Sequence, residues 1–214
     1  MTPLVIVGAG GFGREVLDVV QAINLRMLTF EFLGFLDDGP VDEKILARRG
    51  ARLLGTSQEL AAIDAEYLIG IGSPEARRRV DRLATGFGRR PAVGVHPAAT
   101  LGSDVNIGPG AVITAGTILT TNITMGRHVH VNINATVGHD CILADYVTIN
   151  PGVNVSGRVT LGEAVTLGAG STVLQGISVG SGSIVGAGAV VFRDLPPGVV
   201  AFGIPARTMA RSTS

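Results

Sequence analysis

One histidine of the chain is followed directly by an acid, in the pair His139-Asp140. Histidine titrates near neutral pH, so its imidazole can take a proton from an amine or a hydroxyl that attacks a carbonyl group. A neighbouring carboxylate can orient the imidazole and stabilise the imidazolium that forms. We therefore take both as candidate catalytic residues, with His139 as a general base and Asp140 as its partner.

A glycine-rich turn near the start of the chain is a second candidate site. It has the spacing Gly-x-Gly-x-x-Gly, follows the apolar run Leu4 to Val7, and precedes a segment with helical apolar spacing. Such a turn offers amide N–H groups at a helix N-terminus, where a pyrophosphate is stabilised. The candidate binding residues of this turn are Gly8, Gly10, Gly11, Phe12 and Gly13.

Two more turns are expected beside it. Asp37 and Asp38 follow a predicted strand at 30–36, and Gly72-Ser73 follows one at 67–71. Alternating strands and helices form a parallel sheet, and ligands bind at the carboxyl ends of such strands. We expect these residues to contact the same ligand as the glycine turn. About 90 residues are too few for both halves of an NAD domain, which favours a mononucleotide-like ligand.

Charge is unevenly distributed along the 214 residues. The first 90 hold 12 basic and 12 acidic residues, and the remaining 124 hold five of each. This break predicts domains at 1–90 and 91–214. The net charge of zero disfavours nucleic acid and anionic membranes as partners, and the single cysteine favours a cytoplasmic protein. The uncharged stretch 164–192 is not expected to insert into a membrane, because small polar residues recur through it.

The second segment repeats every six residues. A large aliphatic residue or methionine occupies each sixth position: Val95, Leu101, Ile107, Ile113, Leu119, Met125, Val131, Val137, Leu143, Ile149, Val155, Leu161, Leu167, Val173, Val179, Val185 and Val191. A small or β-branched residue generally follows four positions later. Neither a helix nor an ordinary strand has this period, whereas a β-solenoid has it.

The repeat resembles that of hexapeptide-repeat proteins, whose fold is a left-handed parallel β-helix. Three units form one triangular coil in that family, so residues 95–190 imply a little over five coils. His139 then points out of the packed interior, and Gly157, one coil further on, leaves a gap beside it for an acyl carbonyl. The sparse charge on the outer faces predicts a homotrimer. The tail after Val191 breaks the period and is expected to cap the last coil.

From Val5 to Ala206 the chain resembles the NeuD/PglD-type sugar acetyltransferases, also known as the sialic acid O-acetyltransferase family. The resemblance implies a small Rossmann-like α/β domain that binds a nucleotide-linked sugar. It also implies a β-helix that binds acetyl-CoA between neighbouring subunits of a trimer. The family's His-acid dyad falls on His139-Asp140. The residues that the resemblance assigns to acetyl-CoA are Asn132, Thr148, Gly157, Ala169 and Ala187, with the Gly157 amide facing the thioester carbonyl.

The expected activity is direct transfer of an acetyl group from acetyl-CoA to the amino group of a nucleotide-linked amino sugar, within glycan biosynthesis. O-acetylation of a sugar hydroxyl needs the same base and stays open. A non-catalytic binding protein also stays open. So does a zinc enzyme resembling the γ-class carbonic anhydrases, which use three histidines on this fold. The spacing of His128, His130 and His139 disfavours that alternative, and we expect no metal.

We expect mainly structural roles for the remaining reactive side chains. Cys141 falls at a small inward position and is expected to pack in the core. His128 and His130 are expected at the surface or against a ligand, and His96 at a hinge. The run Arg77-Arg78-Arg79 is expected to be a solvated helix face from which one arginine reaches a phosphate.

Overall fold

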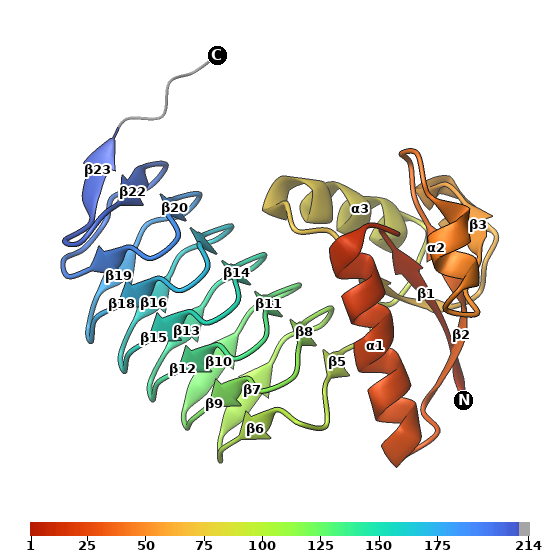
Figure 1. Ribbon diagram of the computed structural model, residues 1–214, viewed down its shortest axis with the longest axis horizontal. Coiled ribbons are helices and arrows are strands. Elements are labelled where there is room, and N and C mark those ends of the chain that lie inside the picture. The colour runs from red at the N-terminus through yellow and green to blue at the C-terminus, as the bar shows by residue number, and fades with distance from the viewer. Residues whose placement is uncertain (210–214) are drawn as a thin grey trace. The chain divides into compact units, whose positions relative to one another are not determined.

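The computed structural model describes residues 1–209 as two compact units that meet between Pro97 and Ala98 (Figure 1). Residues 210–214, the end of the tail included in the expected second domain, lie outside the described residues. No helix within residues 1–209 is long and apolar enough to cross a membrane.

The first unit is a four-stranded parallel sheet with helices. Its elements are β1 (Thr2–Val7), α1 (Gly11–Arg26), β2 (Phe30–Leu36), α2 (Glu43–Ala47), β3 (Leu53–Gly55), the 3₁₀ helix η1 (Ser57–Ala61), β4 (Glu66–Ile69), α3 (Pro74–Gly86) and β5 (Gly94–Val95). The sheet order is β3-β2-β1-β4. Strand β1 pairs with both β2 and β4 and is therefore central.

The core of this unit lies on both faces of the sheet. Val5 and Val7 of β1 pack in a buried cluster with Val80 and Ala84 of α3. The alternate residues Leu4 and Ile6 are also fully buried, and α1 contacts β1 and β2. Burial on both faces explains why β1 has a continuous apolar sequence instead of an alternating one.

The glycine turn joins β1 to α1 at a very close approach of backbones. Gly8 has a φ of 102°, which favours glycine. A Cβ at Gly13 would lie against the carbonyl oxygen of Gly8, far inside contact distance. The turn therefore needs glycine at both ends for packing alone.

We expect Gly13→Ala to destabilise the protein by about 3 kcal/mol, because only backbone movement can relieve the clash. Gly11→Ala is the matched control, since a Cβ there meets nothing within 4 Å. Thermal unfolding of the two variants measures the difference. Equal melting temperatures would contradict the close packing described for this turn.

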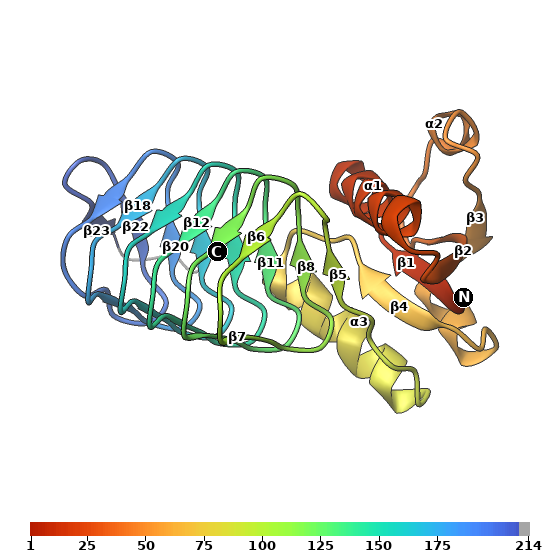
Figure 2. The same cartoon turned by 90° about the horizontal axis from the view of Figure 1, so that it is seen from below.

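The second unit is a left-handed parallel β-helix of short strands (Figure 2). The strands are β6 (Thr100–Leu101), β7 (Val105–Ile107), β8 (Val112–Ile113), β9 (Ile118–Leu119), β10 (Ile123–Met125), β11 (His130–Val131), β12 (Thr136–Val137), β13 (Ile142–Leu143), β14 (Thr148–Ile149), β15 (Asn154–Val155), β16 (Thr160–Leu161), β17 (Thr166–Leu167), β18 (Thr172–Val173), β19 (Ser178–Val179), β20 (Ile184–Val185), β21 (Val190–Val191), β22 (Val200–Phe202) and β23 (Arg207–Met209).

The strands form three faces, and the strands from β6 to β21 pair with one another at 18-residue intervals. One face has the order β7-β10-β13-β16-β19, and a second has β6-β9-β12-β15-β18-β21. The third runs from β8 through β11, β14, β17 and β20 to β22. In β12 and β15, for example, Thr136 pairs with Asn154. The three-unit coil is therefore confirmed.

The inward positions match the six-residue repeat. Leu119, Val131 and Val137 are fully buried, as is Ala135 at a small position. At the end of the unit β22 extends the ladder from β20, and β23 pairs antiparallel to β22. The tail thus continues one face of the β-helix and then reverses.

The corners have their own six-residue pattern. Within residues 1–209, the non-glycine residues with positive φ all fall in one register of the repeat: Asp104, Asn122, His128, Asn134, Asp140, Tyr146, Arg158 and Ala164. Asparagine, aspartate and glycine adopt this left-handed conformation most easily. A residue at such a corner stacks on the corner residues 18 positions before and after it.

Candidate active site

The His139-Asp140 pair lies on a corner of the β-helix, between β12 and β13. The Nδ1 atom of His139 is 2.7 Å from Oδ2 of Asp140. Both side chains are accessible, with 47% and 42% of their surface exposed. Because Nδ1 faces the carboxylate, Nε2 is the ring nitrogen that can take a substrate proton. The structure therefore brings together the two residues assigned to the dyad.

Gly157 lies directly against the imidazole ring. A Cβ built on Gly157 would come within 2.5 Å of Nε2 and 2.6 Å of Cε1 of His139. The next residue, Arg158, donates its backbone N–H to the carbonyl oxygen of His139 at 2.7 Å. The space beside Gly157, expected to hold an acyl carbonyl, is therefore occupied by the imidazole ring itself.

The carboxylate of Asp140 has a second hydrogen-bond partner besides His139. Asn122 donates its side-chain N–H to Oδ1 of Asp140 at 2.6 Å. The hydrogen bond with His139 is the main cause that holds the pKa of Asp140 below its usual range, followed by the hydrogen bond from Asn122, while the charge of Arg158 adds to it. Asp140 is therefore ionised at neutral pH.

Cys141 is packed inside the β-helix beside the dyad. Its side chain is 1% exposed, and its Sγ donates to the carbonyl oxygen of Ser156 at 3.2 Å. Burial raises the pKa of the Cys141 thiol. A buried thiol with a raised pKa is a poor nucleophile, which agrees with the expected packing role.

His128 and His130 differ from expectation because both are fully buried. The ring of His128 stacks on the ring of Tyr146, one coil later, with centroids 5.9 Å apart. These are neighbouring corner positions in one column, so the stacking follows from the 18-residue coil. Among the described residues, no group of three or more His, Cys, Asp or Glu side chains could hold a metal ion.

A cleft of about 400 Å³ lies in the first unit, at the carboxyl ends of β1 and β2. It is lined by Val7, Gly8, Asp37, Asp38, Ser57, Gln58, Ile71, Ala76, Arg79, Val80 and Leu83. One wall is apolar and comes largely from α3, whereas the carboxylates and η1 supply polar groups. The lining of the cleft thus includes three residues of the predicted site, namely Gly8, Asp37 and Asp38.

The two carboxylates of the cleft also hold its loops together. Oδ2 of Asp37 accepts the backbone N–H of Ala9 in the glycine turn at 2.7 Å. Asp38 accepts the backbone N–H and the hydroxyl of Ser57 at 2.7 and 2.9 Å. Asp37 therefore fixes the glycine turn, and Asp38 fixes the start of η1.

The other residues of the glycine turn follow Gly8 closely in the sequence, but they do not line the cleft. Gly10 occupies the N-cap position of α1, and both Gly10 and Gly11 have open space where a Cβ would be. Phe12 is half-buried, and Gly13 packs on Gly8. Gly10 and Gly11 accordingly leave the N-terminus of α1 open to a ligand.

Gly72 and Ser73 shape the start of α3. Ser73 caps this helix by accepting the backbone N–H of Ala76 at 3.3 Å. The carbonyl oxygen of Gly72 accepts a hydrogen bond from Arg77 at 2.9 Å. Arg77 is fully buried, so the expectation of a solvated arginine face is wrong at this position.

Three polar residues of the cleft were not assigned to the predicted site. Ser57 and Gln58 belong to η1, a short element without a periodic apolar pattern. Arg79 lines the cleft from α3 and is exposed. It is therefore the arginine of the 77–79 run that is available to a phosphate.

The residues assigned to acetyl-CoA fall on different parts of the β-helix. Asn132 is 6% exposed and donates to the carbonyl oxygen of Ile149 at 3.0 Å, and Thr148 is 3% exposed. Ala169 and Ala187 are exposed and stack one coil apart on a corner that does not carry His139. Within one chain, the dyad and Gly157 form one cluster and this alanine corner forms another.

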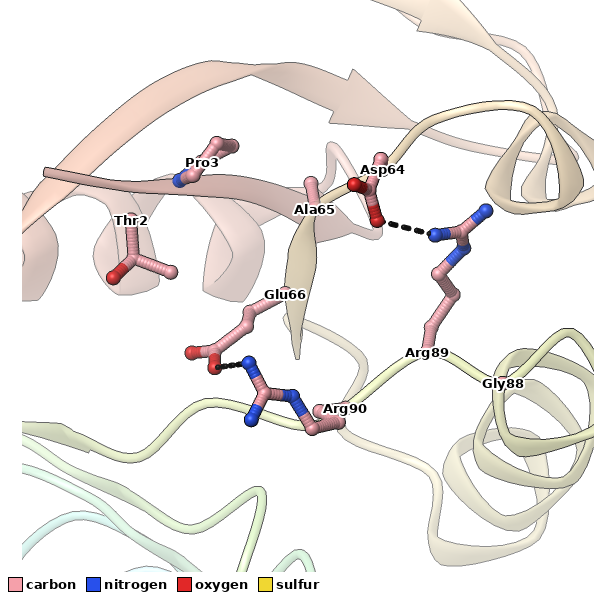
Figure 3. A pocket seen from close by; sticks show the side chains of 8 residues that line it. All are labelled: Thr2, Pro3, Asp64, Ala65, Glu66, Gly88, Arg89 and Arg90. Carbon is pink, nitrogen blue, oxygen red and sulfur yellow. Dashed lines mark hydrogen bonds and ion pairs between the residues drawn. The ribbon is translucent and has the colours of Figure 1, made fainter.

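A second pocket of the first unit lies at the opposite, amino-terminal end of β1 and β4 (Figure 3). Asp64 pairs with Arg89 at 2.7 Å, and Glu66 pairs with Arg90 at 3.4 Å. The charged side chains that line this pocket are thus paired with one another. Parallel-sheet folds also bind their ligands at the other edge.

Known proteins match both units. Residues 3–82 match the family described as PglD N-terminal domain, and residues 158–193 match the hexapeptide repeat of succinyl-transferase. The acetyltransferase domain of PglB from Neisseria gonorrhoeae, solved with acetyl coenzyme A, is 33% identical, with a TM-score of 0.88 over 97% of this chain and 99% of that one. The chain belongs to the PglD-type family of sugar acetyltransferases.

Two further relatives of this PglD-type chain act on or bind one sugar nucleotide. GDP-perosamine N-acetyltransferase from Escherichia coli O157:H7 is 34% identical over 150 residues, which span 69% of this chain and 66% of that relative. PerB from Caulobacter crescentus, solved with CoA and GDP-perosamine, is 29% identical, with a TM-score of 0.89 over 98% of both chains.

Proposed function

We propose that the protein transfers an acetyl group from acetyl-CoA to the amino group of a nucleotide-linked amino sugar. The observation that carries the proposal is the accessible His139-Asp140 pair on the corner of a β-helix, joined to a unit with a nucleotide-sized cleft. The activities named for the relatives support an amine acceptor over a hydroxyl.

The proton path follows from the dyad. Nε2 of His139 accepts a proton as the sugar amine attacks the thioester carbonyl and forms the new C–N bond. The Asp140 carboxylate accepts the Nδ1–H and stabilises the imidazolium. When the C–S bond breaks, the imidazolium returns its proton to the departing CoA sulfur. The products are the acetylated sugar and free CoA, and His139 regains its starting protonation state. No covalent enzyme intermediate forms.

The tetrahedral intermediate needs a hydrogen-bond donor for its oxyanion. We assign that role to the Gly157 backbone N–H, which donates to no acceptor within residues 1–209. Its neighbours in the chain are anchored, because Ser156 donates to Val173 and Arg158 donates to His139. A donor held on both sides needs no rearrangement during the reaction.

The cleft of the first unit is the proposed nucleotide site. The open N-terminus of α1, at Gly10 and Gly11, suits the diphosphate, and Arg79 supplies a positive charge. Asp37 and Asp38 can also accept hydrogen bonds from hydroxyl groups, since each oxygen keeps a free lone pair.

We also propose a homotrimer. The alanine corner at Ala169 and Ala187 is separate from the dyad within one chain, so a CoA groove formed between subunits would join the two. Exposed apolar side chains on the β-helix, among them Ile118, Ile133 and Ile142, provide surface for such contacts. Light scattering that gives a monomer at micromolar concentration would contradict a shared site.

The proposal is tested by an assay of thiol release, supported by calorimetry and metal analysis. Thiol release from acetyl-CoA is followed with two acceptors that differ only in an amine or a hydroxyl on the sugar. We expect turnover with the amine. Turnover with the hydroxyl alone would make the protein an O-acetyltransferase. No binding of CoA by calorimetry would indicate a non-catalytic protein, and stoichiometric zinc required for activity would indicate a metalloenzyme.

We expect Asp37→Ala to weaken binding of the nucleotide sugar by about 10- to 100-fold, because it removes a charged acceptor that also holds the glycine turn. Affinity for CoA should change less than two-fold. Calorimetry with each ligand gives both values. Glu31→Ala is the matched control, because Glu31 is an exposed acid on β2, the strand that ends just before Asp37. Loss of CoA binding with normal sugar binding would reverse the assignment of the two units.

A further inference from the structure

The corner column that contains Asp140 places one uncharged side chain directly against the dyad. Asp104, Asn122, Asp140, Arg158 and Gly176 follow at 18-residue intervals, all with φ between 54° and 76°. Successive coils are about 4.8 Å apart. A residue of this column can therefore reach only the corner residues immediately before and after it, and for Asp140 these are Asn122 and Arg158.

Asn122 completes the hydrogen bonding of the carboxylate. Oδ1 of Asp140 accepts from Asn122 at 2.6 Å, and Oδ2 faces Nδ1 of His139 at 2.7 Å. The backbone N–H of Asp140 also donates to the carbonyl oxygen of Thr121, the neighbour of Asn122. With one partner on each oxygen, rotation of the carboxylate breaks at least one hydrogen bond.

This restraint matters because the dyad is exposed. A carboxylate that is 42% exposed can turn toward water and leave the imidazole without its acceptor. The backbone conformation fixes the positions of the Cα and Cβ atoms of Asp140, but it does not fix the rotation of the carboxyl group. Asn122 has no ionisable group, so it restrains that rotation without competing for the proton.

We infer that Asn122 is a positioning residue of the acetyl transfer, which acts on His139 through the carboxylate of Asp140. The inference rests on the proposed role of His139 as the base. Asn122 touches neither reacting atom, so its removal should lower kcat and leave the KM values of both substrates nearly unchanged. Arg158 is the only other charged group of the column adjacent to Asp140.

The first test is Asn122→Ala, for which we expect kcat to fall about ten-fold while both KM values stay within two-fold. Asp104→Ala is the matched control, because Asp104 has the same left-handed conformation in the same column and does not adjoin Asp140. The two variants should lose similar stability, and only Asn122→Ala should lose activity. Equal activity in the two variants would overturn the inference.

The second test exchanges the two groups. Asp140→Asn alone keeps an acceptor oxygen for Nδ1 of His139, because the Asn122 amide can turn its own oxygen toward the new side-chain NH2, and removes the negative charge. In the double variant Asn122→Asp/Asp140→Asn, the new carboxylate at position 122 accepts from the new amide, whose oxygen is then free for His139. We expect the double variant to be several-fold faster than Asp140→Asn. Independent, multiplicative losses would contradict a positioning role.

If the wild-type protein itself transfers no acetyl group, or if His139→Ala is fully active, the proposed function fails instead.

Discussion

His139→Ala is expected to lower kcat by about 10²- to 10⁴-fold, which corresponds to about 3–5 kcal/mol of activation free energy. The reason is that, within residues 1–209, the neighbouring imidazoles of the β-helix, those of His128 and His130, are buried. The fold should survive, because the His139 side chain is 47% exposed and its loss leaves no closed cavity. Thiol release and thermal unfolding of the same preparation give both quantities.

Asp140, the other residue of the dyad, provides the comparison for this variant. Asp140→Asn should cost less than His139→Ala, because the amide can still accept a hydrogen bond from Nδ1 and only the charge is lost. Binding of the acceptor should stay within a few-fold in both variants. Near-normal turnover of His139→Ala would show that the histidine is structural. Complete unfolding of the variant would show the same.

Gly157→Ala is expected to lower kcat/KM by about 100-fold without touching the nucleotide site. The new methyl group would lie within 2.5 Å of Nε2 and 2.6 Å of Cε1, so the imidazole must leave its position. Its contact with Asp140 would then be lost, and the methyl group would cover the proposed oxyanion donor. Overpacking of this kind also costs about 1–3 kcal/mol of stability. Steady-state kinetics and thermal unfolding test both effects.

Gly86→Ala is the matched control for this variant. A Cβ at Gly86 meets nothing within 4 Å, and the residue ends α3 in the other unit. Its activity and stability should equal those of the wild type within error. If Gly157→Ala kept its activity as well, the imidazole would not be held against Gly157 in the working enzyme.

The six-residue period explains why much of the β-helix could be predicted. A residue's place in the repeat determines whether it points inward, outward or to a corner, so burial of Val137 and exposure of His139 follow from counting. Asn122 lies 18 residues before Asp140, and the same counting applied to Asp140 would have found it.

The first unit was less predictable because its contacts do not repeat. Ser57 and Gln58 come from a 3₁₀ helix of five residues, which leaves no apolar period in the sequence. Arg77 lies in a basic run that looks solvated, yet its side chain turns back to the carbonyl oxygens of Ile71 and Gly72. Charge alone did not distinguish Arg77, which is buried, from Arg79, which lines the cleft.

Acetylation of an amine on a nucleotide-linked sugar by means of the His139 dyad can be measured directly. The measurement is mass spectrometry of the acceptor after incubation with acetyl-CoA and either wild-type protein or His139→Ala. We expect one acetyl group on the sugar amine with the wild type, and at least a 100-fold slower reaction with the variant. Acetylation at equal rates by the two proteins, or no acetylated acceptor with the wild type across a panel of nucleotide amino sugars, would contradict it.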